Sequence, residues 1–122
     1  MRYAKQVQID ALKGKTFVSV TETDATVTFH GTPSYRLEHQ QDCCESVWLE
    51  DVTGDLADLV GSPIIMAEES SEVGKDDGCE HTTWTYYKLG TAKGYVTLRW
   101  CGTSNGYYSE SVDLFELEGD RA

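Results

Sequence analysis

Turn-forming residues punctuate this chain at short and regular intervals. Gly, Asn and Pro recur about every ten residues, and the segments between them are rich in Val, Thr, Tyr and Phe. This spacing is typical of short strands joined by turns, and no internal repeat interrupts it. We therefore predict an α+β fold, mainly antiparallel β-sheet, with about six to seven strands and one or two short helices. A chain of 122 residues can enclose one core, so residues 1–122 are expected to form a single domain.

The amino-terminal third favours three neighbouring strands. Residues 16–23 (TFVSVTET) and 25–30 (ATVTFH) are rich in strand-forming side chains with partial alternation. The sequence GTP then turns the chain into residues 34–40 (SYRLEHQ). The pattern predicts a three-stranded meander, preceded by a short helix within residues 3–13.

The middle of the chain combines a helix signal with polar segments. In residues 53–63 (TGDLADLVGSP), Thr53 or Asp55 can cap a short helix, and the following Gly and Pro end it. Residues 63–69 (PIIMAEE) are expected to form a buried strand. Residues 70–78 (SSEVGKDDG) have the polarity of a mobile loop.

The carboxy-terminal third is predicted to form three strands in two successive hairpins. A three-residue loop with a bulge at Gly106 would pair Leu98 with Val112 and so keep apolar side chains on one face. On the opposite face, Arg99 would then lie diagonally from Asp113. The adjacent tyrosines of the pairs YY at 86–87 and 107–108 must point to opposite faces of the sheet.

Negative charge is concentrated in one part of the chain. The formal net charge is −11, and residues 41–80 hold twelve carboxylates against Lys75 alone. Such a block repels nucleic-acid phosphates and attracts basic proteins, so no direct binding to nucleic acid is expected. The chain opens without a signal-peptide-like stretch and has no apolar run of the roughly 18 residues that a membrane span needs. We therefore expect it to remain in the cytosol.

The cysteines leave several chemistries open. His39, Cys43, Cys44, Cys79 and His81 could supply zinc ligands, but adjacent cysteines do not match the usual ligand spacing. A cysteine nucleophile would need a nearby histidine, and the surrounding carboxylates disfavour its thiolate. Buried thiols are the simpler interpretation. We expect the sequence DCCE to follow the last strand of the first sheet, with its two thiols pointing into the core. No metal and no other cofactor is therefore expected.

Three motifs resemble one family. The sequences HQQDCCESV, GDLADLVG and SNGYYSE occur in this order and are similar to the pattern of small proteins of unknown function encoded by tailed bacteriophages. The likeness spans about residues 14–117, and GCEH at 78–81 lies outside the pattern. The resemblance implies a phage protein acting in the cytoplasm of an infected bacterium, and it brings no activity, cofactor or binding residue with it.

These observations favour a binding protein over an enzyme, although catalysis at Cys43 or Cys44 stays open. The leading hypothesis is a non-enzymatic phage accessory protein whose acidic surface docks a basic host or phage protein and inhibits it. The alternative is a small-ligand binder, such as a sponge for a signalling nucleotide in anti-defence; a homodimer is also open. The candidate binding residues are Asp42, Glu45, Glu50, Asp51, Asp55, Asp58, Arg99, Asn105, Tyr107 and Tyr108.

Overall fold

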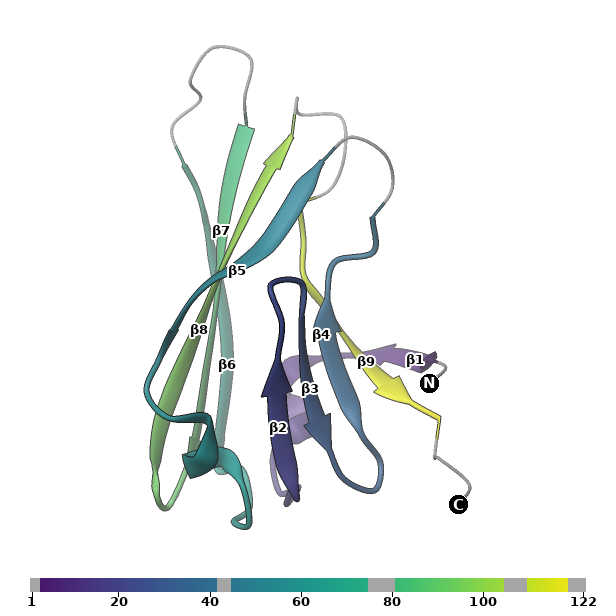
Figure 1. The fold of residues 1–122 in the computed structure, drawn as a ribbon, viewed down its shortest axis with the longest axis vertical. Helices are drawn as coiled ribbons and strands as arrows, with labels where there is room; N and C mark the ends of the chain where they lie inside the picture. Colours follow the sequence, from purple (N-terminus) through teal and green to yellow (C-terminus); the bar gives the residue numbers. More distant parts are fainter. Residues whose placement is uncertain (1–2, 42–44, 75–80, 105–109, 119–122) are drawn as a thin grey trace.

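The computed structural model describes residues 3–41, 45–74, 81–104 and 110–118. This part of the chain forms two facing antiparallel sheets with two short 3₁₀ turns (Figure 1). The strands are β1 (Tyr3–Val7), β2 (Ser19–Glu22), β3 (Thr26–His30), β4 (Tyr35–Glu38), β5 (Ser46–Thr53), β6 (Met66–Val73), β7 (His81–Thr91), β8 (Gly94–Ser104) and β9 (Asp113–Leu117). The 3₁₀ turns are η1 (Ile9–Leu12) and η2 (Leu56–Leu59).

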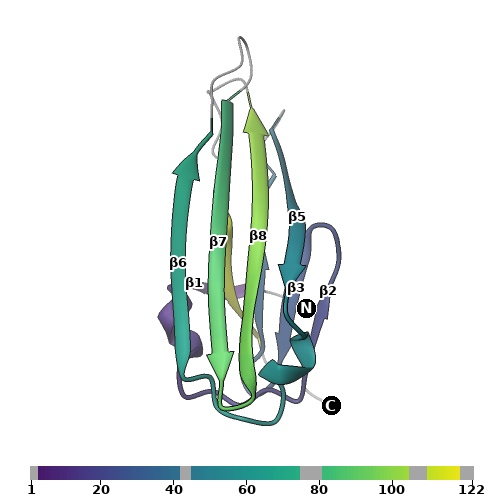
Figure 2. The same ribbon diagram turned by 90° about the vertical axis from the view of Figure 1, so that its left-hand side faces the viewer.

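The two sheets differ in size and in strand length. One sheet has five short strands in the order β1-β9-β4-β3-β2, and the other has four strands in the order β5-β8-β7-β6. Strands β7 and β8 have 11 residues each and form the centre of the four-stranded sheet (Figure 2). The mainly antiparallel prediction is confirmed. The described residues hold nine strands rather than six or seven, and both helical segments are 3₁₀ turns.

The core lies between the sheets because each strand directs alternate side chains inward. Val96, Leu98 and Trp100 of β8 are buried at every second position. They belong to one apolar cluster with residues of the five-stranded sheet, including Val27 and Leu37. Tyr87 is 1% exposed and faces the core, whereas its neighbour Tyr86 is partly exposed on the opposite face. The predicted split of this tyrosine pair is confirmed.

The amino-terminal meander is confirmed as β2, β3 and β4, whereas the short helix expected within residues 3–13 is confirmed only in part. Residues 3–7 form strand β1, and only the four residues of η1 are helical. β1 pairs with the edge of β9. The Tyr3 ring stacks on the Phe115 ring of β9 with 4.6 Å between the ring centroids, and this contact depends on the pairing of the two strands. Tertiary pairing thus overrides the local helix signal.

The first predicted carboxy-terminal hairpin is confirmed as β7 and β8, but the second is wrong. Strand β8 has β7 on one side and β5 on the other, so both of its edges are occupied. Leu98 accordingly pairs with Tyr87 and Val52 instead of Val112. The chain crosses to the five-stranded sheet, where β9 pairs with β1 and β4. Arg99 and Asp113 therefore belong to different sheets.

The middle of the chain follows the prediction only in part. Asp55 caps η2 by accepting a 2.9 Å hydrogen bond from the Ala57 amide, as a helix-start signal predicts. Strand β6 begins at Met66 and continues through the first half of the segment expected to be a mobile loop. Among its residues only Ala67 is buried, because β6 is an edge strand with one long exposed side. Residues 75–80 lie outside the described part.

Within the part of the chain that the structure describes, no helix has both the length and the hydrophobicity that a membrane crossing requires.

Candidate functional site: the outer face of the four-stranded sheet

The four-stranded sheet presents a large side-chain surface on the side away from the core, which we call the outer face. Its side chains alternate with the buried residues of β7 and β8, and cross-strand partners share this side. This side of the sheet is turned toward the viewer in Figure 2. The outer face comprises Trp48, Glu50, Asp51, Thr53, Met66, Glu68, Ser70, Glu72, Trp84, Tyr86, Lys88, Tyr95, Thr97, Arg99 and Cys101.

Aromatic rings and two cations occupy the centre of the outer face. Trp48 and Trp84 both pair with Cys101, which lies between them in the sheet and is 4% exposed. The Arg99 guanidinium lies over the Trp84 ring at 5.3 Å, and its Nε is buried with no hydrogen-bond partner among the described residues. The Lys88 ammonium lies 5.5 Å from the centre of the Tyr95 ring. These contacts are cation–π interactions, which hold the flat rings against the sheet.

Carboxylates line the two edges of the outer face. On β5, the register shift between Leu49 and Asp51 places Glu50 and Asp51 on the same edge. The Trp48 indole Nε1 donates a hydrogen bond to Glu50 Oε2 at 2.7 Å. On the other edge, the Tyr86 hydroxyl donates to Glu72 Oε1 at 3.1 Å. The rings thus orient the carboxylates that flank them.

The topology explains why the acidic segment gathers on one sheet. Strands β5 and β6 are consecutive in the chain around η2, and they form the two edges of the four-stranded sheet. Eight of the twelve acidic residues between positions 41 and 80 lie in the described part. Apart from the buried Glu45, they belong to β5, β6 or the connection through η2: Glu50, Asp51, Asp55, Asp58, Glu68, Glu69 and Glu72.

Nine of the ten predicted binding residues fall into three groups, and the tenth, Glu45, is buried. Glu50, Asp51 and Arg99 come together on the outer face, with Asp51 paired in register with Arg99. Asp55 and Asp58 lie at η2, beyond the end of β5. The prediction did not include the outer-face residues Trp48, Trp84, Tyr86, Glu68 and Glu72, although period-two alternation in both segments was the signal that could have identified them. Asp42, Asn105, Tyr107 and Tyr108 lie outside the described residues, as do Cys43, Cys44 and Cys79.

Glu45 does not contribute to an exposed acidic surface, because it is only 2% exposed. Its Oε2 lies 2.6 Å from His39 Nε2, and Gln41 Nε2 donates to its backbone carbonyl oxygen at 2.5 Å. The other ring nitrogen of His39, Nδ1, donates to the Ser111 carbonyl oxygen at 2.7 Å, since a carbonyl can only accept. A buried carboxylate needs such partners to offset its lost hydration. His39 and Glu45 therefore join the ends of the connection between β4 and β5.

A second buried carboxylate, Glu110, ties the end of β8 to β7. It is 6% exposed and accepts hydrogen bonds from the hydroxyls of Thr83, at 2.7 Å, and Ser104. Gly102 leaves the room for this group, because a Cβ there would lie 2.7 Å from Glu110 Cβ. Within the described ranges, no three histidine, cysteine or carboxylate side chains come together in a group that could hold a metal ion.

Several carboxyl groups beside the core carry raised pKa values. Desolvation raises the pKa of Asp113, although the nearby His39 opposes the shift. Partial loss of hydration also raises the pKa of Glu69, which is still exposed; Tyr87 opposes the shift and Asp113 adds to it. The pKa of Glu38 is raised by burial. Folding therefore favours the neutral form of these groups.

We expect the protein to gain stability when the pH is lowered from 7 toward 5. A pKa that folding raises contributes stability that is complete below the unfolded value of about 4 and is lost as the pH rises through the folded value. The double variant Glu69→Gln, Asp113→Asn should show a smaller pH dependence, and its amide at 113 can still accept the hydrogen bond from Gln6. Urea denaturation of the original protein and of the variant, each at pH 5 and pH 7, measures how the free energy of unfolding depends on pH. An unchanged slope in the variant would show that these carboxyls are not responsible.

Comparison with known proteins gives a family without an assigned role. No curated protein and no solved structure matches the chain. A family model described as a domain of unknown function, DUF7448, matches residues 10–114, which include the whole four-stranded sheet with its outer face and the strands β2, β3 and β4 of the other sheet. The chain therefore belongs to the DUF7448 family of domains of unknown function.

Proposed function

We propose that this protein is a non-enzymatic accessory protein of a tailed bacteriophage that docks a basic host or phage protein through the outer face. The observation that carries the proposal is the combination of aromatic rings, partly exposed at Trp48, Trp84 and Tyr86 and exposed at Tyr95, with carboxylates on both edges of one sheet. Aromatic side chains provide contact area and attract cations, and carboxylates pair with lysine and arginine. A flat surface with both groups is complementary to a protein surface rich in basic residues.

The proposed consequence of docking is inhibition. Basic grooves in bacterial proteins commonly hold nucleic acid, and an acidic partner that covers such a groove competes with the phosphate backbone. We propose the cytoplasm of the infected bacterium as the place of action, with a nucleic-acid-binding or defence protein as the partner. Binding of a small anionic ligand is less well supported, because the two outer-face cations, Lys88 and Arg99, already contact aromatic rings and lie between carboxylates.

Charge reversal at the β6 edge tests the proposal. The double variant Glu68→Lys, Glu72→Lys should capture a basic partner from infected cells about tenfold less efficiently, because two attractive contacts become repulsive. The matched control is Glu22→Lys, Glu118→Lys, which changes two exposed carboxylates, one on β2 and one just after β9. This control changes the net charge by the same amount, so it should capture the partner as efficiently as the original protein.

Quantitative mass spectrometry of the captured proteins, at low salt and at about 0.5 M salt, measures the effect. We expect high salt to weaken capture, because exposed charges are screened over a few ångströms at that ionic strength. Equal loss in both charge variants would indicate a response to net charge and not to the outer face. Capture that survives both high salt and the reversal at β6 would contradict the proposal.

A further inference from the structure

The two edges of the four-stranded sheet differ in how they are covered. At β5, the Leu49 amide donates to the Asp24 carbonyl oxygen of the β2–β3 turn at 2.7 Å, so the other sheet covers this edge. Strand β6 pairs with β7 along one edge, and no strand of the described residues lies beside its other edge (Figure 2). Strand β6 has eight residues, which is long for an exposed edge.

The backbone of β6 offers hydrogen-bonding groups on its uncovered side. The Gly74 amide donates to the Thr82 carbonyl oxygen at 2.7 Å. This bond shows that the backbone groups of Gly74 point toward β7, and in an antiparallel pair every second residue does so. Because such residues alternate, the N–H and C=O groups of Glu69, Ser71 and Val73 point away from β7. All three residues are exposed, and Val73 is 66% exposed. An exposed row of this kind is a template for another strand.

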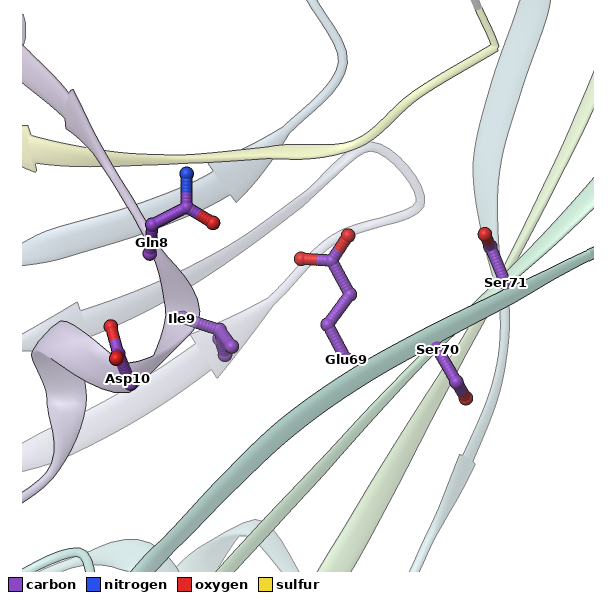
Figure 3. Close-up of a pocket in the computed structure, with 6 residues that line it drawn as sticks. All are labelled: Gln8, Ile9, Asp10, Glu69, Ser70 and Ser71. Atoms are coloured by element: carbon purple, nitrogen blue, oxygen red, sulfur yellow. The ribbon is translucent and has the colours of Figure 1, made fainter.

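A cleft of about 510 Å³ runs beside this edge. Glu69, Ser70 and Ser71 of β6 form one wall, and the segment from Gln8 to Asp10 forms the other. Figure 3 shows the Glu69 side chain directed from β6 toward that segment, while the Ser70 side chain points to the opposite side of the strand. A strand paired with β6 would lie about 4.8 Å from it in the plane of the sheet, and the side chains that it directs inward would face this cleft.

The charges around the edge select the occupant. Alternate side chains of an added strand would face Glu68 and Glu72 on the outer face, and the others would face Glu69 and Asp10 at the cleft. Lysine or arginine is complementary at both sets of positions. A second copy of the chain fits poorly, because β6 paired with β6 would bring the three glutamates of each copy together. This edge therefore disfavours the homodimer that the sequence left open.

We propose that an extended segment of the partner, rich in lysine or arginine, adds to β6 as a further strand of the four-stranded sheet. The inference rests on the proposed function and specifies how the basic partner is held. Backbone hydrogen bonds to Glu69, Ser71 and Val73 supply affinity, and the flanking carboxylates supply the preference for basic side chains.

A peptide of about twelve alternating Lys and Thr residues serves as the probe. Ser71→Pro removes the outward N–H without removing a bond to β7, and proline is tolerated at such edge positions. The matched control Ser71→Ala keeps the N–H and loses only the hydroxyl. We expect Ser71→Pro to weaken binding of the probe at least tenfold and Ser71→Ala to change it less than twofold. Circular dichroism checks that both variants are folded.

Hydrogen exchange of the original protein gives an independent measurement that needs no variant. Saturating peptide should slow exchange of the amides of Glu69, Ser71 and Val73 at least tenfold. Undiminished binding to Ser71→Pro, unchanged exchange at these amides, or no binding of the peptide to the original protein would overturn the strand addition. The capture experiment tests the docking proposal independently of the added strand. If Glu68→Lys, Glu72→Lys captures less partner while the peptide tests fail, the partner docks on the outer face without adding a strand to β6.

Discussion

Replacing His39 with alanine is expected to lower the free energy of unfolding by about 3–5 kcal/mol, because it removes the basic side chain that is paired with the buried Glu45 carboxylate. The Glu45 side chain is fully buried and His39 is 6% exposed, with 2.6 Å between the paired atoms. The substitution also removes the hydrogen bond from His39 to the Ser111 carbonyl oxygen, which links β4 to the segment before β9. Urea denaturation followed by circular dichroism measures the loss.

A double variant separates the buried charge from simple loss of packing. In His39→Leu, Glu45→Leu neither charge remains, and replacing a buried ion pair by apolar side chains is often close to neutral. We therefore expect the double variant to be clearly more stable than His39→Ala alone. A loss below about 1 kcal/mol in His39→Ala would mean that Glu45 does not depend on this partner.

Replacing Trp84 with alanine is expected to weaken binding of a basic partner about thirtyfold, which corresponds to about 2 kcal/mol. Trp84 lies on β7, one of the two central strands of the outer face, and the Arg99 guanidinium rests on its ring. Its removal deletes an aromatic contact surface and releases Arg99, which would then repel a cationic surface. Isothermal calorimetry with the partner identified by capture, or with the lysine-threonine peptide, measures the change.

The matched control is Tyr3→Ala, which removes an aromatic residue from the five-stranded sheet. Tyr3 stacks on Phe115, so the control also breaks an aromatic contact, but on the other sheet. We expect Tyr3→Ala to leave binding within about twofold of the original value. Equal losses in the two variants would place the effect in general destabilisation and not in the outer face.

The local side-chain pattern predicted strands well and their long-range pairing poorly. The alternation around Tyr86 and Tyr87 places one ring in the core and the other outside, because period two depends only on neighbouring residues. The choice of sheet for β9 depends on a different strand. Strand β5, which ends 51 residues before the end of β8, occupies the edge of β8 that the predicted hairpin needed. Local register cannot reveal a competitor so distant in the chain.

The candidate site was predictable in its charge and not in its geometry. The sequence identifies the acidic block that contains Glu50 and Asp51, yet it does not reveal that the block becomes the two edges of one sheet around Trp84 and Arg99. Glu45 is the informative exception. It belongs to the same block in sequence, but His39 six residues earlier draws it into the interior, where a carboxylate is stable only with a partner.

The indole N–H signals in a ¹⁵N NMR spectrum test the outer-face account most directly. The chain has three tryptophans: Trp48 and Trp84 lie on the outer face, and Trp100 is 1% exposed in the core. Adding the partner or the lysine-threonine peptide to saturation should shift the signals of Trp48 and Trp84 and leave that of Trp100 in place. Binding that leaves the signals of Trp48 and Trp84 unmoved would contradict docking at this face.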